Sequence, residues 1–507
     1  MSTNQIKGGV ALSYVIIFLT NGIGLVLTPF IIRSLGTSEY GLYTMIGALI
    51  GYMTVLDFGL NSTIIRFVAK YQAEKDAKGQ ENFLAHSFIM YGVLSVLVIL
   101  IGLGIYFNLE EIYGETLTDD EMYKAKTMFM VLIFNLAVSL PGGAFSGICS
   151  GYEEFILPKI INISRYLLRS ALVVGLLLMG GDSIGLVVLD TIMNLLFIAA
   201  NAVIVFKKLK VKIHLYHFEK SMIKLMLGYS IWVFVFALVN QMRWQSGQLV
   251  LGLNYTTNII AVYAVGITLG NYYGAFSSAI DSVLLPRAMQ MVAAKASSLE
   301  LTKMFIKISR LTLFVLLFIL GGFVIVGKDF IYFWVGDDFK EAYLYVILMM
   351  LGLILFLSQS FAVNILKARN KLSFRGIVIL VVTILGAALG YYLSLEYGGL
   401  GMIIGTVVFM LVDRLIMTLY FHNKIHLNML YYYKNVGILF VNSAAAIFLG
   451  YYIATYLPSH SIPYALSKAI IFSAIYVIAM IFILNEDEKR LLFNMLNFVK
   501  RKIGFGK

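Results

Sequence analysis

Two arginines, Arg165 and Arg169, lie inside one apolar stretch, 157–179. A charged side chain deep in a membrane helix costs about 2.5–3.5 kcal/mol on insertion scales, so such a residue needs a reason to be there. Four residues apart, the two guanidinium groups share one helix face. A guanidinium stays charged and binds oxyanions through paired hydrogen bonds, which suits a diphosphate or an acidic sugar. The pair therefore predicts a substrate site, and the structural alternative is an ion pair with Asp57 or Asp190.

Three further ionisable residues lie in apolar stretches and extend this prediction. Arg243 adds a cation from the second half of the chain and is a third substrate-binding candidate. Asp57 is the first candidate for coupling or gating, because loading and unloading a proton in a membrane helix can favour one open state over another. Asp281 is the second, nearer the inner surface, where water reaches it easily. For Asp57 the alternative is a structural salt bridge to Arg165 or Arg169.

No set of residues typical of an enzyme accompanies these charges. The chain has no HExxH motif, no cysteine pair, no phosphate-binding glycine loop, and six scattered histidines. We therefore expect a transporter with no catalytic residue, no cofactor and no metal site. The single cysteine, Cys149, excludes a disulfide within one chain, and we expect a buried, inert thiol.

The elements that must position these residues are membrane-spanning helices. Hydrophobic residues make up 60% of the chain and charged residues 13%, against about 45–50% and 25% in soluble domains. Fourteen apolar stretches are long enough to cross a bilayer, and a backbone in hydrocarbon must satisfy its own hydrogen bonds, so all should be helical. They are 10–32, 40–65, 83–107, 127–149, 157–179, 184–206, 225–250, 257–285, 305–326, 342–366, 376–394, 399–421, 436–456 and 464–484.

The distribution of basic residues orients the helices. Most of the 39 Lys and Arg fall in alternate loops, which are cytoplasmic by the positive-inside rule, as are both termini. The opposite loops, including 108–126, are acidic and hold few cations, namely Arg33, Lys124, Lys126, Lys328 and Lys340. The net charge of +12 is thus explained by membrane insertion and by anionic inner-leaflet lipid, and we expect no nucleic-acid partner.

The first six helices and the next six resemble each other at a nearly constant offset. Gly47 and Gly51 match Gly266 and Gly270, and 146–155 matches 363–372. An even number of helices per repeat gives two parallel lobes, a common transporter plan with the substrate path between them. We expect an all-α polytopic membrane protein with two parallel six-helix repeats plus a C-terminal helix pair. Its parts are a first lobe 1–206, a cytoplasmic linker 207–224, a second lobe 225–422, a hairpin 435–484 and an amphipathic cytoplasmic tail 485–507.

Four segments carry a family resemblance: Arg33-Ser-Leu-Gly-Thr-Ser-Glu-Tyr-Gly-Leu-Tyr43, Val55-Leu-Asp-Phe-Gly-Leu60, Asn240 to Gly252, and Tyr263 to Gly266. They resemble the polysaccharide (Wzx-type, O-antigen) flippases of the multidrug/oligosaccharidyl-lipid/polysaccharide exporter superfamily. Many relatives carry an acid just before Leu249, but here Ser246-Gly-Gln occupies that stretch, so no carboxylate role is transferred there.

The resemblance implies a function and a location. The expected substrate is an undecaprenyl-diphosphate-linked oligosaccharide, moved from the inner to the outer leaflet of the bacterial cytoplasmic membrane by alternating access. Membrane lipids are the other expected partners. The resemblance also raises coupling to a proton or sodium gradient and cooperation with a polysaccharide polymerase.

Two alternatives remain. The first is a cation-coupled drug exporter or a lipid II flippase of the same superfamily; cationic drugs favour acidic cavities, and the arginine pair argues against an exporter of such drugs. The second is a membrane polysaccharide polymerase or ligase, which generally carries a large catalytic outer loop, whereas the longest outer loop here is 108–126.

Overall fold

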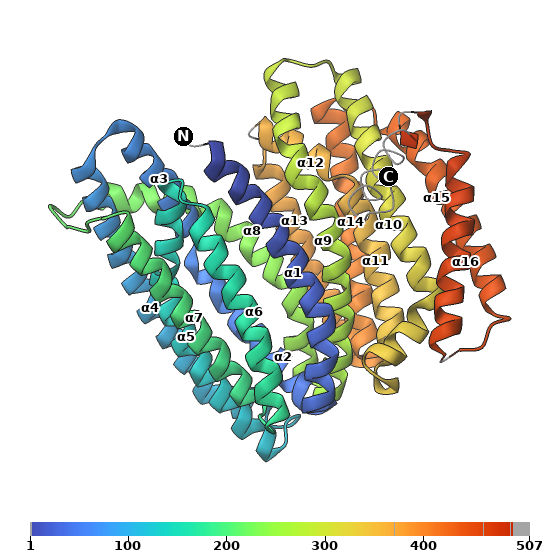
Figure 1. Ribbon diagram of the computed structural model, residues 1–507, viewed down its shortest axis with the longest axis horizontal. Coiled ribbons are helices and arrows are strands. Elements are labelled where there is room, and N and C mark those ends of the chain that lie inside the picture. Colours follow the sequence, from blue (N-terminus) through green and yellow to red (C-terminus); the bar gives the residue numbers. More distant parts are fainter. Residues whose placement is uncertain (1–2, 370, 460, 487, 490–507) are drawn as a thin grey trace, which may run out of the picture. The chain divides into compact units, whose positions relative to one another are not determined.

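The computed structural model describes residues 3–369, 371–459, 461–486 and 488–489, and its regular elements are all helices over that part of the chain. The chain divides into two compact units, one of residues 1–264 with 379–406 and one of residues 265–378 with 407–507. These units are defined by spatial contacts, whereas the domain boundaries in the sequence analysis come from the internal repeat, so those boundaries stay a prediction. Each unit is described by itself below (Figure 1).

The first unit is built mainly from the N-terminal helices. They are α1 (Thr3–Leu35), α2 (Thr37–Met53), a 3₁₀ turn η1 (Thr54–Asp57), α3 (Leu60–Glu74), α4 (Ala77–Tyr113), α5 (Asp119–Gly151), α6 (Ile156–Leu178), α7 (Ser183–Val203) with the π turn η2 (Ile204–Lys208), and α8 (Lys220–Gly252). Residues 257–264 begin α9 (Thr257–Ala293), and 379–406 supply most of α13 (Ser373–Tyr397) and the start of α14 (Gly399–Ile425).

Helix α5 is the centre of this unit, where it packs against α2, α3, α4 and α7, while α1 lies against α6 and α2 against α8 (Figure 1). Side-chain caps begin several helices, because the first N–H groups of a helix have no partner within it. Thr118 and Glu121 form a reciprocal capping box at the start of α5, and Asp182 caps α7. Cys149 is buried in α5, which confirms the expected buried thiol.

The second predicted span, 40–65, is a broken helix and differs from the expected continuous one. After η1, Phe58 and Gly59 adopt left-handed backbone conformations with φ of 50° and 70°. Helix α8 covers the break, since Phe58 stacks on Phe234 with ring centroids 4.6 Å apart. The amide of Gln241 donates to the carbonyl oxygen of Gly51 at 2.6 Å, so α8 satisfies a backbone acceptor beside the break.

The second unit is organised around α10 (Ser298–Trp334). Its other elements are η3 (Asp337–Phe339), α11 (Ala342–Ser358), α12 (Ser360–Ala368), α15 (Met429–Ala454), α16 (Ile462–Ile481) and the remaining parts of α9, α13 and α14. Helix α10 packs against α11, α12, α15 and α16. The ring of Phe305 stacks on Tyr432 of α15 at 4.3 Å, and Phe318 stacks on Phe472 of α16.

Two buried ion pairs fasten the C-terminal helices to α10. Arg310 binds Glu488 through two hydrogen bonds, 2.7 Å from Nε and 3.0 Å from Nη2, and Lys468 Nζ lies 2.8 Å from Asp329 Oδ2. All four side chains are at most 5% exposed. Glu488 also accepts from the backbone N–H of Asn485, the first residue of the predicted tail. The rest of the predicted tail, 490–507, lies outside the described residues.

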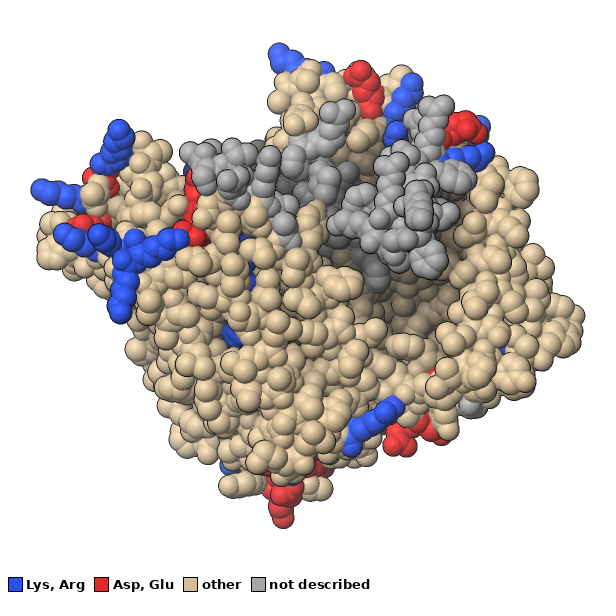
Figure 2. Space-filling model, viewed as in Figure 1, with Lys and Arg blue, Asp and Glu red and all other residues tan. Residues whose placement is uncertain are grey.

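Membrane-crossing helices dominate both units. Eleven helices are long and apolar enough to cross a membrane by length and composition, counted over the described residues, or twelve if α11 and α12, bent by 41°, form one broken span. Large apolar side chains such as Phe18, Phe107 and Phe482 are exposed, as lipid contact requires. In Figure 2 the charged side chains gather near helix ends, and the surface between them carries few.

Substitution of Gly59 tests whether the stability of the protein depends on the break in the second span. A Cβ at Gly59 would lie 2.4 Å from Val233 Cγ1, and its φ of 70° disfavours any side chain. We expect Gly59→Ala to destabilise the protein by about 1–3 kcal/mol, measured as thermal unfolding in detergent. The matched control is Gly47→Ala in α2, where a Cβ would meet nothing within 4 Å. Equal unfolding temperatures for both variants would contradict the prediction.

Candidate functional site

The predicted arginine pair of α6 faces α7. Arg169 binds Asp190 in a two-point pair, with Nε 2.5 Å from Oδ1 and Nη2 2.8 Å from Oδ2. The hydroxyl of Tyr43 lies 3.5 Å from the same carboxylate. The side chains of Arg169 and Asp190 are only 23% and 27% exposed, and a charge with so little water needs an opposite charge beside it. Of the two acids considered for the structural alternative, Asp190 is therefore the partner, and Asp57 is not.

Arg165 has a different environment from Arg169, although the two share a face as predicted. Its guanidinium carbon lies 4.5 Å from the ring centroid of Phe197, two helical turns after Asp190 on α7. Cation–π contact supplies some stabilisation without neutralising the charge. Arg165 makes no ion pair with a residue that the structure describes. It is thus a half-buried cation whose charge remains available to an anion.

Asp57 lies at the break of the second span, where η1 ends. Its carboxylate is near the hydroxyl of Tyr91 in α4 and the backbone amides of Gly59 and Asn61. Left-handed residues directly after Asp57 turn these amides towards it, so the break itself builds the surroundings of this side chain. The prediction of a continuous helix over 40–65 did not include this arrangement. In the sequence, Gly59 was the one residue that could have indicated it.

The remaining predicted site residues are less closely defined. Arg243 is half-buried in α8, two residues after the Gln241 that contacts the break. The side chain of Asp281 lies outside the described residues. Asp413 and Arg414, two further ionisable residues, form a buried pair with each other in α14. Among described residues, no group of three or more His, Cys, Asp or Glu side chains is placed to hold a metal ion.

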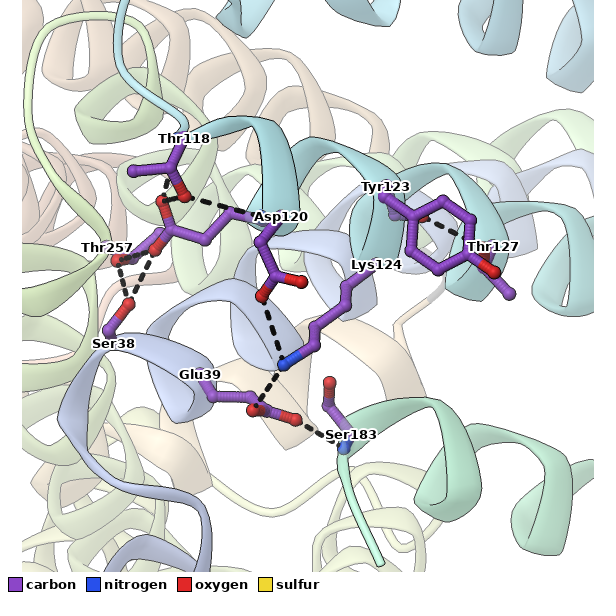
Figure 3. Close-up of polar contacts among 10 residues, drawn as sticks. Ser38, Glu39, Thr118, Asp120, Tyr123, Lys124, Thr127, Ser183 and Thr257 are labelled. Carbon is purple, nitrogen blue, oxygen red and sulfur yellow. Dashed lines mark hydrogen bonds and ion pairs between the residues drawn. The ribbon is translucent and has the colours of Figure 1, made fainter.

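A polar cluster, at the helix ends that the predicted topology places outside, was not foreseen from the sequence; we call it the outer cluster. Its first half joins the starts of α2, α5 and α9 (Figure 3). Ser38 and Thr257 both donate to Glu121 Oε1, at 2.5 and 2.7 Å, and their own oxygens are 2.9 Å apart. Helices α2 and α9 approach so closely that a Cβ at Gly41 would lie 1.9 Å from the Thr257 carbonyl oxygen.

The second half of the outer cluster joins α2, α5 and α7 (Figure 3). Lys124 Nζ lies 3.0 Å from Glu39 Oε2 and 3.3 Å from Asp120 Oδ2. The other oxygen of Glu39 accepts from the backbone N–H of Ser183 at 2.7 Å, at the start of α7. The segment 33–43, which carries part of the family resemblance, therefore helps to join four helix ends. Ser38 and Glu39 bind partners on α5, α7 and α9, and Gly41 permits the close approach of α9 to α2. The capping-box spacing of Thr118 and Glu121 was the one available signal for this cluster.

Three solved structures are similar to this chain over most of its length. A solved structure of the lipid II flippase MurJ, in an inward closed conformation, matches 93% of this chain and 98% of its own, with 16% identity and a TM-score of 0.67. An inward-facing multidrug resistance MATE family transporter of the MOP superfamily matches 78% of this chain and 93% of its own, with 12% identity and a TM-score of 0.67. The eukaryotic MATE transporter AtDTX14 covers 83% of this chain and 96% of its own, at 14% identity and a TM-score of 0.58.

The fold is that of the multi-pass transport proteins of the MOP superfamily. The family model described as "Polysaccharide biosynthesis protein" matches residues 6–292, more than half of the chain. This chain belongs to that polysaccharide biosynthesis family, in agreement with the resemblance of its motifs. No curated protein sequence matches it significantly.

The Arg169–Asp190 pair gives a stability prediction. Asp190→Asn leaves a guanidinium with little water and no counter-charge, so we expect a loss of about 3 kcal/mol or more in stability, seen as a lower unfolding temperature in detergent. Asp119→Asn, which removes an exposed carboxylate from the first turn of α5, is the control. If Asp190→Asn unfolds no earlier than Asp119→Asn, the pair does not fasten α6 to α7.

Proposed function

We propose that this protein is a flippase that moves an undecaprenyl-diphosphate-linked oligosaccharide from the inner to the outer leaflet by alternating access. The single observation that carries the proposal is Arg165, a cation in a membrane helix with no ion-pair partner among the described residues. A diphosphate supplies the anion that such a site lacks. Membership of the polysaccharide biosynthesis family supports the oligosaccharide, and the polyprenyl tail would stay in lipid.

The two arginines of α6 have different roles in this proposal. Arg165 binds the diphosphate directly. Arg169 holds α6 against α7 through Asp190 and reaches the substrate only if that pair opens. Arg243 of α8 is the proposed third substrate contact, from the second predicted lobe. Because each cation would gain a charged hydrogen bond, loss of one should cost about tenfold in affinity.

Coupling is assigned to the broken span. Asp57 lies where the backbone already departs from the helix, so a change of its charge acts on residues whose hydrogen bonding is not fixed by an α-helix. We propose that proton or sodium binding at Asp57 shifts the equilibrium between open states, with Asp281 as the second coupling residue. The contact of Gln241 with Gly51 would carry such a change from the break to α8.

The outer cluster is proposed to close the outer end of the substrate path. Thr257 belongs to the second predicted lobe, whereas Ser38 and Glu121 belong to the first. Their hydrogen bonds support a state closed on the outside. Both hydroxyls donate to the Glu121 carboxylate, and such a charge-assisted hydrogen bond contributes about 1.5–3 kcal/mol, which water at the end of the helices can replace when the gate opens.

We further propose the finer topology. Helices α8 and α9, of 33 and 37 residues, would complete fourteen spans, with two parallel six-helix repeats and a C-terminal pair. Both termini would be cytoplasmic, in the cytoplasmic membrane of a bacterium. A polysaccharide polymerase that receives the flipped unit is the proposed partner.

Arg165 tests the substrate site. Proteoliposomes would hold a fluorescent polyprenyl-diphosphate oligosaccharide, and flipping would be read as protection from an impermeant quencher. We expect Arg165→Gln to lower the initial flipping rate about tenfold, because the diphosphate loses a charged hydrogen bond, and Arg165→Lys to retain part of it. Lys70→Gln, an exposed residue of α3, is the control. Wild-type rates in Arg165→Gln would remove Arg165 from the substrate site, and a wild type that does not flip would overturn the function.

A reversible cross-link tests the outer gate. With Cys149→Ser as background, Ser38→Cys and Thr257→Cys replace hydroxyl oxygens that are 2.9 Å apart. We expect oxidation to close the outer end and stop flipping, and reduction to restore it, because alternating access requires this end to open. Each single variant serves as a control. Unchanged flipping in the cross-linked protein would contradict the gate.

A further inference from the structure

A pocket opens in the second unit at the end of α10 that the topology places outside. Its volume is about 380 Å³, and its lining includes Lys328 and Tyr332 of α10, Gly336, Asp337 and Lys340 of the turn after α10, and Ser459 of the α15–α16 loop. It belongs neither to the α6–α7 arginine site nor to the outer cluster, which both lie in the first unit. The size is within the range of about 300–1,000 Å³ typical of small-molecule sites.

Two lysines, Lys328 and Lys340, line the pocket. Lys328 and Lys340 make no ion pair with a residue that the structure describes; Lys328 Nζ instead lies 5.4 Å from the ring centroid of Tyr343. The two other lysines on the predicted outer side behave differently, since Lys124 pairs with Glu39 and Lys126 pairs with Glu110. Among the described residues that line the pocket, Asp337 is the one acid, so these residues together carry a net positive charge.

The pocket walls are held in place by buried interactions. Lys468 of α16 binds Asp329 of α10 and lies 3.5 Å from Ser459 Oγ, so the ion pair fixes the loop that carries Ser459 next to α10. The buried ring of Phe339 anchors the turn that carries Asp337 and Lys340. A site whose walls are already ordered loses less entropy on binding. The C-terminal hairpin, which the internal repeat does not explain, therefore supplies one wall of this pocket.

We propose that this pocket binds an acidic sugar unit, with a carboxylate or phosphate group, on the outer face of the membrane. The two ammonium groups provide point charges for the anion. The exposed ring of Tyr332 offers an apolar face to a sugar ring, and Asp337 and Ser459 offer partners to its hydroxyl groups. The proposal rests on the proposed function only for the source of the sugar, namely the glycan that has crossed the membrane.

Direct binding to the full-length protein tests the proposal. The protein would be placed in nanodiscs of phosphatidylcholine, and the binding of glucuronate, glucose 1-phosphate, glucose and inorganic phosphate measured by saturation-transfer NMR. We expect both acidic sugars to bind, glucose not to bind detectably, and inorganic phosphate to bind more weakly than glucose 1-phosphate. The double variant Lys328→Gln, Lys340→Gln should weaken binding of the acidic sugars about tenfold or more, while Lys126→Gln should bind as the wild type.

Each other outcome overturns the site. Acidic sugars that bind the double variant as well as the wild type exclude the two lysines. Equal binding of inorganic phosphate and glucose 1-phosphate excludes a sugar contact. Displacement of both acidic sugars by phosphatidylglycerol in the nanodisc identifies a lipid headgroup site instead. Flipping plays no part in these measurements, so a protein that binds acidic sugars but does not flip would refute the proposed function and leave this pocket standing.

Discussion

The scarcity of water in hydrocarbon decides most of this structure, because each polar group must find its partner within the protein. The backbone meets the requirement by forming helices. Side chains meet it through pairs such as Arg169 with Asp190 and Arg310 with Glu488, in which both nitrogens used are matched to carboxylate oxygens. The first pair joins the consecutive helices α6 and α7, and the second joins α10 to the segment after α16, so the requirement that excludes lone charges also fixes the packing.

The second span departs from a continuous helix, and helix α8 covers the break. Helix α8 supplies an amide to Gly51 and aromatic contact to Phe58, while Asp57 lies among the backbone amides that the break turns towards it. Irregular backbone at membrane depth is found where it is buried in protein or lines a cavity, and in transporters it commonly marks an ion or substrate site. The proposed coupling at Asp57 therefore depends on the broken backbone around this residue as well as on its carboxylate.

Several polar side-chain contacts lie at helix ends, where water is available and can replace a hydrogen bond that breaks. The outer cluster uses hydroxyls, one lysine and carboxylates to join α2, α5, α7 and α9. The lysines of the pocket beside α10 make no ion pair with a described residue, and our proposal assigns them to a ligand. The contrast between paired and unpaired lysines is what separates a structural contact from a candidate site here.

The sequence determined the membrane class, the transporter family and the shared face of Arg165 and Arg169, because apolar length, motif residues and helical spacing are local properties. It also identified Asp190 as one available partner. The tertiary structure alone decided that Arg169 takes Asp190 while Arg165 lies on Phe197, and that Ser38, Glu39 and Gly41 bind other helix ends. The break at Asp57 was also visible only in the tertiary structure. These outcomes depend on which helices become neighbours, and helix neighbours are set by packing between segments far apart in the chain.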